Sequence, residues 1–198
     1  MSKKNVILIS REYGSGGRGI GEKIAKELNI PFYDKEVIRM ACQESGFDVS
    51  LFENIEEQSK HPLSYFLSMY SATMTPSDLS LNDKVFLVQS KVIRDLAKDS
   101  CVIIGRCADY ILRDYDNVLR VFIHADMEDR IARVIDEYKD EDDNIKEKIR
   151  RIDKNRATYY NYYSNRRWGN LENYDLSLNT SKVDVDTCVD IIKNIINN

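Results

Sequence analysis

The sequence predicts an α/β domain in which helices pack on both faces of a sheet of five parallel strands. Five short segments rich in Val, Ile, Leu and Phe alternate with longer segments whose apolar residues recur every three or four positions. The short segments are typical of strands that are buried on both faces, and the longer ones of amphipathic helices. Regular alternation of the two favours a doubly wound parallel sheet, in which all strands end at the same edge.

The elements follow from this alternation in chain order. The predicted strands are residues 6–10, 30–34, 101–104, 119–123 and 174–178. The predicted helices are residues 20–28, 36–42, 85–97, 128–138, 145–159 and 185–196, with a short helix ending at 112. Between 45 and 83 the pattern loosens around two prolines, which predicts an inserted helical cap spanning about 36–83 within one domain of residues 1–198.

A glycine-rich turn joins the first strand to the first helix. It consists of Gly14, Ser15, Gly16, Gly17, Arg18 and Gly19. Free N–H groups at a helix start, with no Cβ atoms in the way, can surround the phosphates of a nucleotide such as ATP. A strand-to-helix turn with unusual backbone angles needs the same glycines, so the sequence leaves both interpretations open.

This turn departs from the phosphate-binding motif G-x-x-x-x-G-K-[ST]. In register with that motif, Arg11 stands at the first Gly, Gly17 at the Lys and Arg18 at the Ser or Thr. Arg18 is then a cation in the first turn of a helix, which the helix dipole disfavours unless an anion is also present. We therefore expect Arg18 to bind donor phosphates and to take part in catalysis; the alternative leaves it in solvent. A dinucleotide-binding fingerprint fits the glycine spacing less well.

Two further strand ends carry polar residues. Ligands of open α/β sheets bind beyond the carboxyl ends of the strands. Asp34 ends the second strand, so it is a candidate for the site, for the cap of the helix that follows, or for both. Arg106 follows the third strand, and its guanidinium group can bind a phosphate through two hydrogen bonds. Asp109 is a substrate-binding candidate beside it, although it could simply be the ion-pair partner of Arg106.

We expect the segment from about 139 to 170 to act as a mobile lid. A charged turn leads into a helix, and residues 149–168 are the most basic part of an otherwise acidic chain. Arg156 falls in the apolar stripe of this helix, and a buried arginine requires a partner. Asp153 could be that partner, as could a phosphate that binds when the segment closes.

The composition excludes several classes of protein. The chain has 198 residues and a net charge of −4, which argues against broad binding of nucleic acid. It contains no apolar run of membrane-spanning length, so we expect no membrane partner and a cytoplasmic location. The four cysteines form no C-x-x-C pair, which argues against a zinc site.

Five segments, taken in order, resemble the cytidylate kinases, especially the archaeal type. They are Gly14-Ser15-Gly16, the run from Glu36 to Ala41, Gly105-Arg106-x-Ala108, Arg150-x-x-Asp153-x-x-Arg156 followed by Tyr159-Tyr160, and the run from Tyr174 to Ser181. The segment Ser10 to Arg18 resembles the bacterial cytidylate kinase-like proteins in particular. The resemblance spans nearly the whole chain, but Ile104 stands where bacterial cytidylate kinases carry an Asp before Gly-Arg.

The resemblance implies a three-layer P-loop kinase fold with a substrate cap and a mobile lid. It also implies that Arg39 and Arg106 hold the phosphate of the acceptor. Arg150 and Arg156 would be lid arginines that act on the phosphoryl group in transfer.

The expected activity is transfer of the ATP γ-phosphoryl group, with Mg²⁺, to a small phosphorylated acceptor, foremost CMP or dCMP. Such a transfer depends on positioning and charge neutralisation, which clustered arginines supply. The sequence assigns no residue to the metal and does not define the oligomeric state. Two alternatives remain: a nucleotide-binding regulatory protein without turnover, favoured by the missing Lys, and a kinase for a different small acceptor, favoured by the unusual cap.

Overall fold

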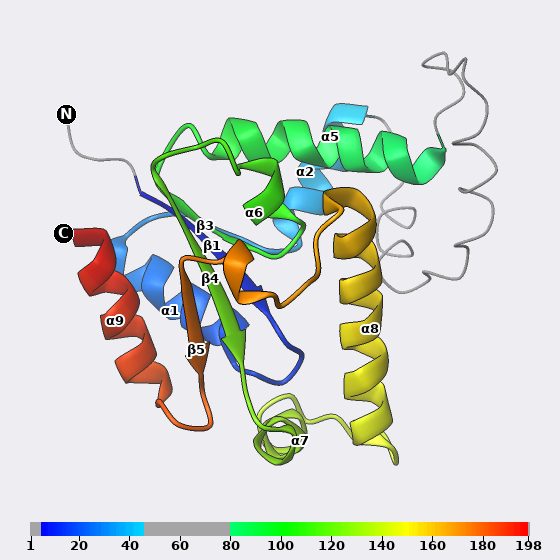
Figure 1. The fold of residues 1–198 in the computed structure, drawn as a ribbon, viewed down its shortest axis with the longest axis vertical. Coiled ribbons are helices and arrows are strands. Elements are labelled where there is room, and N and C mark those ends of the chain that lie inside the picture. The colour runs from blue at the N-terminus through cyan, green and yellow to red at the C-terminus, as the bar shows by residue number, and fades with distance from the viewer. Residues whose placement is uncertain (1–4, 46–79, 198) are drawn as a thin grey trace.

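The computed structural model describes residues 5–45 and 80–197. Most of the predicted cap, residues 46–79, lies outside the described residues. The strands are β1 (Val6–Arg11), β2 (Phe32–Tyr33), β3 (Cys101–Ile104), β4 (Val118–His124) and β5 (Leu176–Asn179). They pair in parallel in the order β2-β3-β1-β4-β5. Figure 1 labels four of them, β3, β1, β4 and β5. The predicted five-stranded parallel sheet is therefore confirmed, with β1 at its centre.

The helices flank the sheet and agree with the sequence pattern except at their ends. They are α1 (Gly17–Leu28), α2 (Glu36–Ser45), α5 (Leu81–Leu96), α6 (Ala108–Ile111), α7 (Met127–Asp136), α8 (Ile145–Ser164) and α9 (Val185–Asn197), with a short 3₁₀ turn η1 (Leu171–Asn173) before β5. The first helix begins at Gly17 rather than at its first apolar residue, because Gly16 lies in the left-handed region at φ 79° and caps it. The helix α8 continues to Ser164 and ends where Asn165 adopts φ 53°.

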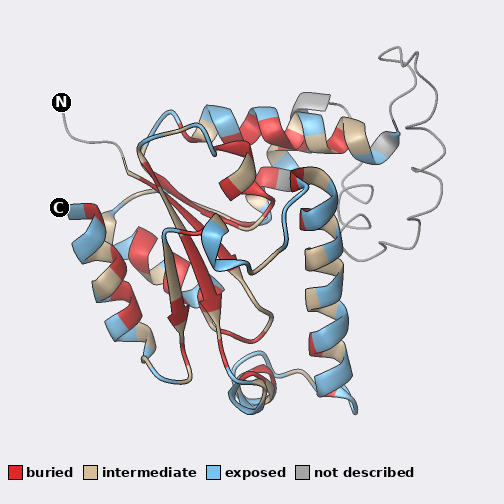
Figure 2. Ribbon diagram, in the orientation of Figure 1, coloured by how far each residue is buried: buried red, intermediate tan, exposed pale blue. Residues whose placement is uncertain are grey.

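The two faces of the sheet carry separate apolar clusters. Alternate residues of β1 point to opposite faces, so Ile7 and Ile9 belong to one cluster and Val6 and Leu8 to the other. The first cluster is closed by α1 and α9, and the second by α2, α5 and α6, as Figures 1 and 2 show. This three-layer arrangement buries β1 almost completely and fixes the position of its carboxyl end.

The long helix α8 lies at that carboxyl end and is held at both of its own ends. Its first turns pack on α7 through Ile145 and Ile149 against Val134. Its last turns place Tyr160 in the cluster below α5 and α6. The middle of α8 therefore passes over the end of β1.

No helix in the described part of the chain combines the length and the apolar character that crossing a membrane requires.

Candidate active site

The turn between β1 and α1 is compact and strongly hydrogen-bonded. Ser15 is buried, and both its backbone N–H and its hydroxyl donate to the carbonyl oxygen of Glu12, at 3.3 and 2.8 Å. Gly14 has φ 79°, and a Cβ atom there would lie 2.8 Å from the carbonyl oxygen of Arg130 in α7. The turn therefore packs directly against α7. Gly14, Ser15 and Gly17 are buried in this turn, while Arg18 and Gly19 in the first turn of α1 are exposed, so an anion would approach the helix N-terminus from that side.

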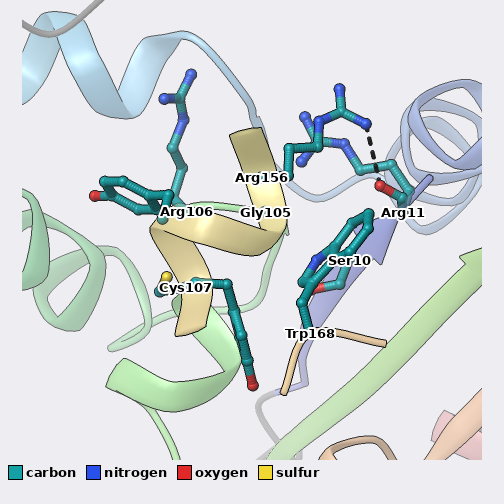
Figure 3. Close-up of a pocket in the computed structure, with 9 residues that line it drawn as sticks. Ser10, Arg11, Gly105, Arg106, Cys107, Arg156 and Trp168 are labelled. Atoms are coloured by element: carbon teal, nitrogen blue, oxygen red, sulfur yellow. Dashed lines mark hydrogen bonds between the residues drawn. The ribbon is translucent and has the colours of Figure 1, made fainter. Parts of the chain in front are cut away.

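A pocket opens beside this turn, at the carboxyl ends of β1 and β3. It is lined by Ser10, Arg11, Gly105, Arg106, Cys107, Arg156, Tyr159, Tyr160 and Trp168. Figure 3 shows Arg11 and Arg156 beside one another, and the Arg156 Nη1 donates to the backbone oxygen of Arg11 at 3.1 Å. Three arginines from β1, the β3–α6 turn and α8 thus surround one pocket, and none of its described lining residues is acidic.

The turn after β3 holds Arg106 in an uncommon conformation. Gly105, Arg106 and Cys107 all have positive φ, at 66°, 61° and 53°. Non-glycine residues pay a conformational cost for this, and such costs are concentrated at functional sites. Arg106 is 8% exposed, and its carbonyl oxygen accepts a hydrogen bond from Gln89 of α5 at 3.3 Å. Arg106 and Arg156, two of the predicted site residues, are therefore brought together by the fold.

Asp109 lies beneath this pocket in a buried pair. It is 2% exposed, and the Tyr160 hydroxyl donates to its Oδ2 at 2.6 Å. Burial raises the pKa of Asp109 above the ordinary 3.8, and the hydrogen bond from Tyr160 acts in the opposite direction. Burial, with the charge of Asp109, also raises the pKa of Tyr160. Because the Asp109 carboxylate is directed at α8, it couples the β3–α6 turn to the predicted lid.

We expect Tyr160→Phe to destabilise the protein by about 1.5–3 kcal/mol at neutral pH, since it removes a hydrogen bond to a buried carboxylate. The variant loses an interaction that lowers the pKa of Asp109, so this pKa rises further. A carboxyl whose folded pKa is raised contributes less stability as the pH rises through that value. The deficit should therefore shrink as the pH falls and Asp109 becomes protonated. Urea unfolding at acidic and neutral pH measures it.

Tyr162→Phe is the matched control, because Tyr162 is 41% exposed on the same helix. Its unfolding free energy should equal that of the wild type at both pH values. A deficit in Tyr160→Phe that is the same at acidic and neutral pH would contradict the coupling to Asp109.

The remaining predicted site residues lie outside the pocket. Arg18 is 56% exposed and forms ion pairs at 3.0 Å with both Asp34 and Glu22. The Asp34 carboxylate thus pairs with Arg18, while the backbone N–H of Asp34 donates to Glu36. Arg39 is exposed on α2, and Gly19 is exposed on α1. Arg150 is exposed on α8 and pairs with Glu147 at 2.7 Å.

An ion-pair cluster centred on Arg130 joins the turn, α7 and α8. The Arg130 side chain is only 5% exposed and pairs with Glu12 at 3.1 Å and with Asp153. Its Nε donates to the carbonyl oxygen of Tyr13 at 2.8 Å, and the Tyr13 backbone N–H donates to Asp153 at 2.8 Å. The predicted lid helix is therefore tied to the glycine-rich turn through Asp153.

Sequence reasoning missed the roles of three arginines in this region. Arg130 and Arg133 of α7 hold the turn, and the Arg133 Nη1 donates to the carbonyl oxygen of Gly14 at 2.7 Å. Arg11 lines the pocket. The position of Arg11 directly after a buried strand was a usable signal, since the same rule identified Asp34 and Arg106. The α7 arginines look like ordinary surface residues of an amphipathic helix, so the sequence pattern offers no signal for them.

The strand order and the glycine-rich turn after the central strand place the protein in the class of P-loop kinases by fold. A shikimate kinase from Bacteroides thetaiotaomicron superposes with a TM-score of 0.55 at 13% identity, covering 98% of this chain and 99% of that one. A gluconokinase from Sinorhizobium meliloti gives 0.52 at 12% identity, covering 100% and 97%. At these identities the likeness concerns the fold alone.

Residues 6–182 match the model of the cytidylate kinase-like family, and the chain belongs to that family. A cytidylate kinase from Pyrobaculum islandicum is 28% identical over 188 residues, which cover 94% of this chain and 89% of that protein. The crystal structure of an uncharacterized protein from Eubacterium ventriosum has a TM-score of 0.72 at 29% identity, covering 98% of this chain and 99% of that one. The resemblance drawn from the sequence motifs is thus confirmed at the level of the family.

Proposed function

We propose that the protein transfers the γ-phosphoryl group of ATP to a small phosphorylated acceptor, with CMP or dCMP as the preferred one. The observation that carries this proposal is the pocket formed by Arg11, Arg106 and Arg156 beside the glycine-rich turn. Arg156 is also paired with Asp153 at 3.7 Å, but the described lining of the pocket holds three cationic residues and no acidic one, which favours a ligand of high negative charge. Phosphoryl transfer brings such an anion together with a need for positioning and charge neutralisation.

In this proposal the backbone from Gly14 to Gly19 holds the donor's phosphates, and Arg18 joins them only by exchanging its ion pairs with Asp34 and Glu22 for the nucleotide. Arg106, with Arg39, Asp34 and Asp109 as further candidates, serves the acceptor. Arg156 of α8 faces the transferring group from its place in the pocket, whereas Arg150 would first have to leave its ion pair with Glu147.

The metal would come with the nucleotide. Mg²⁺ in kinases is held by one or two protein groups together with substrate phosphates, whose charge it neutralises. Arg18 occupies the position of the hydroxyl residue that usually contacts it. Among the described residues, no group of three or more His, Cys, Asp or Glu side chains could hold a metal ion. We therefore assign no residue of this chain to the Mg²⁺.

The test is an acceptor panel with ATP and Mg²⁺: CMP, dCMP, the other nucleoside monophosphates, shikimate and gluconate. The last two are included because kinases named for them share the fold. Production of CDP or dCDP well above the other products supports the proposal. Phosphorylation of another acceptor alone would retain the transferase and reject cytidylate. Binding of ATP without any turnover would favour the second candidate, a nucleotide-binding regulator. The presence of Gly17 where the motif has Lys supports that candidate.

We expect Arg106→Lys to raise the acceptor KM by about tenfold or more, because lysine keeps the charge but loses the two-pronged hydrogen bonding of a guanidinium group. The affinity for ATP should stay near that of the wild type. Initial rates over acceptor concentration, together with calorimetry of ATP binding, measure both. Arg113→Lys, on an exposed residue after α6, is the control. Weaker ATP binding with an unchanged acceptor KM would assign Arg106 to the donor.

A further inference from the structure

We infer that Arg11 replaces the missing P-loop lysine and binds the terminal phosphates of the donor. This assignment rests on the proposed function and deepens it. Lysine in the usual motif reaches the β- and γ-phosphates from the start of the helix. Here the corresponding position is Gly17, the first residue of α1, so the positive charge has to come from another residue.

The space for a lysine at position 17 is taken by Arg11 itself. A Cβ atom on Gly17 would lie 2.7 Å from the Cβ of Arg11 and 3.1 Å from the Cβ of Ile123. Cβ atoms essentially never come within 3.0 Å of another heavy atom, so the contact with Arg11 is excluded and the one with Ile123 is tight. Any residue other than glycine at position 11 therefore requires glycine at position 17, and the stem of Arg11 occupies the space that a lysine stem at position 17 would need.

The far end of Arg11 is directed toward the acceptor side of the pocket. A Cβ atom on Gly105 would lie 2.1 Å from the Arg11 Nη1, so the guanidinium group rests against the backbone of Gly105. Arg106 is the next residue. The Arg11 side chain thus spans from the glycine-rich turn to the turn after β3, between the regions proposed for the donor and the acceptor. Figure 3 shows Arg11, Gly105 and Arg156 around the same space.

The other arginines near the turn are directed elsewhere. Arg18 is paired with Asp34 and Glu22 on the exposed side of α1. Arg130 is held by Glu12 and Asp153. Arg133 donates to the carbonyl oxygen of Gly14 and lies outside the pocket. Among the described arginines, Arg11 combines a start next to the glycine-rich turn with a side chain that lines the pocket.

The experiment compares Arg11→Met with the wild type by calorimetry, using tripolyphosphate, ATP and CMP as separate ligands. Methionine keeps an unbranched stem against Gly17 while removing the charge. Loss of one charge-assisted contact should weaken tripolyphosphate and ATP binding by about tenfold or more, and leave CMP binding within about twofold. Arg113→Met removes the same charge from an exposed position and should bind all three ligands as the wild type does.

A second variant transfers the cation back to the usual position. In Arg11→Gly/Gly17→Lys the clash with Arg11 is removed, and only the contact with Ile123 has to give by a few tenths of an ångström. This double variant should recover part of the tripolyphosphate affinity that Arg11→Met loses. Gly17→Lys alone should weaken binding, because both stems then compete for one space. Melting temperatures identify any variant that fails to fold. In that case Arg11→Lys replaces it: lysine keeps the charge but has a shorter reach, so tripolyphosphate affinity should be partly lost.

The outcomes separate this inference from the function on which it rests. Unchanged tripolyphosphate and ATP binding in a folded Arg11→Met protein, with a wild type that phosphorylates its acceptor, would overturn the role of Arg11 alone. A loss confined to CMP would also overturn it and place Arg11 with the acceptor. A wild type that binds neither tripolyphosphate nor ATP would overturn both the inference and the proposed function.

Discussion

Replacing Arg156 with methionine is expected to lower turnover by about 100- to 1,000-fold, the range found when one preorganised donor to a transition state is removed. The Arg156 guanidinium group donates to the backbone of Arg11 and lies 5.6 Å from the centre of the Tyr13 ring. It therefore reaches the pocket from α8 while α8 rests on the turn. An arginine that meets charge developing during transfer stabilises the transition state more than the bound substrates.

Ground-state affinity separates this role from a structural one. Calorimetry of ATP binding and the melting temperature of Arg156→Met should stay close to the wild-type values while kcat falls. Arg151→Met, on an exposed residue of the same helix, is the matched control and should retain turnover. If stability, affinity and turnover of Arg156→Met fall together, Arg156 is a packing residue. Hydrogen exchange of residues 145–164 adds a check, since protection there should rise when both substrates bind.

The largest loss of stability is expected for Arg130→Met, about 3 kcal/mol in the free energy of unfolding. Removing one partner of a buried ion pair leaves the other charge without compensation, which typically costs 3–5 kcal/mol. The side chains of Glu12 and Asp153 are 26% and 15% exposed, so water screens part of that cost. For a domain of this size the melting temperature should fall by roughly 6–12 °C, as scanning calorimetry can measure.

The carboxylates left behind, rather than the lost arginine, should cause most of this loss: Glu12 loses its ion pair with Arg130, and Asp153 keeps only the longer one with Arg156 at 3.7 Å. Adding Glu12→Gln and Asp153→Asn to Arg130→Met removes both charges and should restore a large part of the stability. Arg133→Met on the same helix serves for comparison, because Arg133 forms one hydrogen bond to the turn and an ion pair of 3.5 Å with an exposed Glu137. An equal loss in the triple variant and in Arg130→Met would contradict this account.

The fold could be predicted because its signals are local. The apolar runs of β1 and β3 and the stripes of α1, α5 and α9 each predict their own element, and parallel pairing follows from the alternation. Deviations occur at element ends: the last strand is Leu176–Asn179 rather than 174–178, because Tyr174 lies at the end of a 3₁₀ turn. Such ends depend on capping geometry that periodicity does not encode.

The candidate site could be predicted in part, where it depends on strand ends. Arg106 was found because it follows β3, and the same argument applies to Arg11. Arg18 was assigned to donor phosphates on the ground that a cation at a helix start requires an anion. In the structure that anion is the carboxylate of Asp34, which helix and strand bring within 3.0 Å. A sequence does not reveal whether a protein group or a ligand supplies the anion.

The ion pairs of Arg130 illustrate why the rest could not be predicted. Its partners lie in the turn before α1 and in the middle of α8, far away along the chain. No periodicity relates residues that distant, and an arginine on an amphipathic helix is most often in water. These contacts follow from the way α7 and α8 pack together, which is a property of the assembled domain.

The central place of β1 has a consequence for how the chain is made. Val6 pairs with Cys101 on one side and with Val118 on the other. During synthesis the first strand therefore cannot pair on both of its edges until β3 and β4, which lie about 100 residues further along the chain, have left the ribosome. Pairings of such long sequence separation form slowly, and an apolar strand with two open edges is prone to associate with other chains. Newly made protein should thus depend on chaperones, or on slow elongation, until β4 is available.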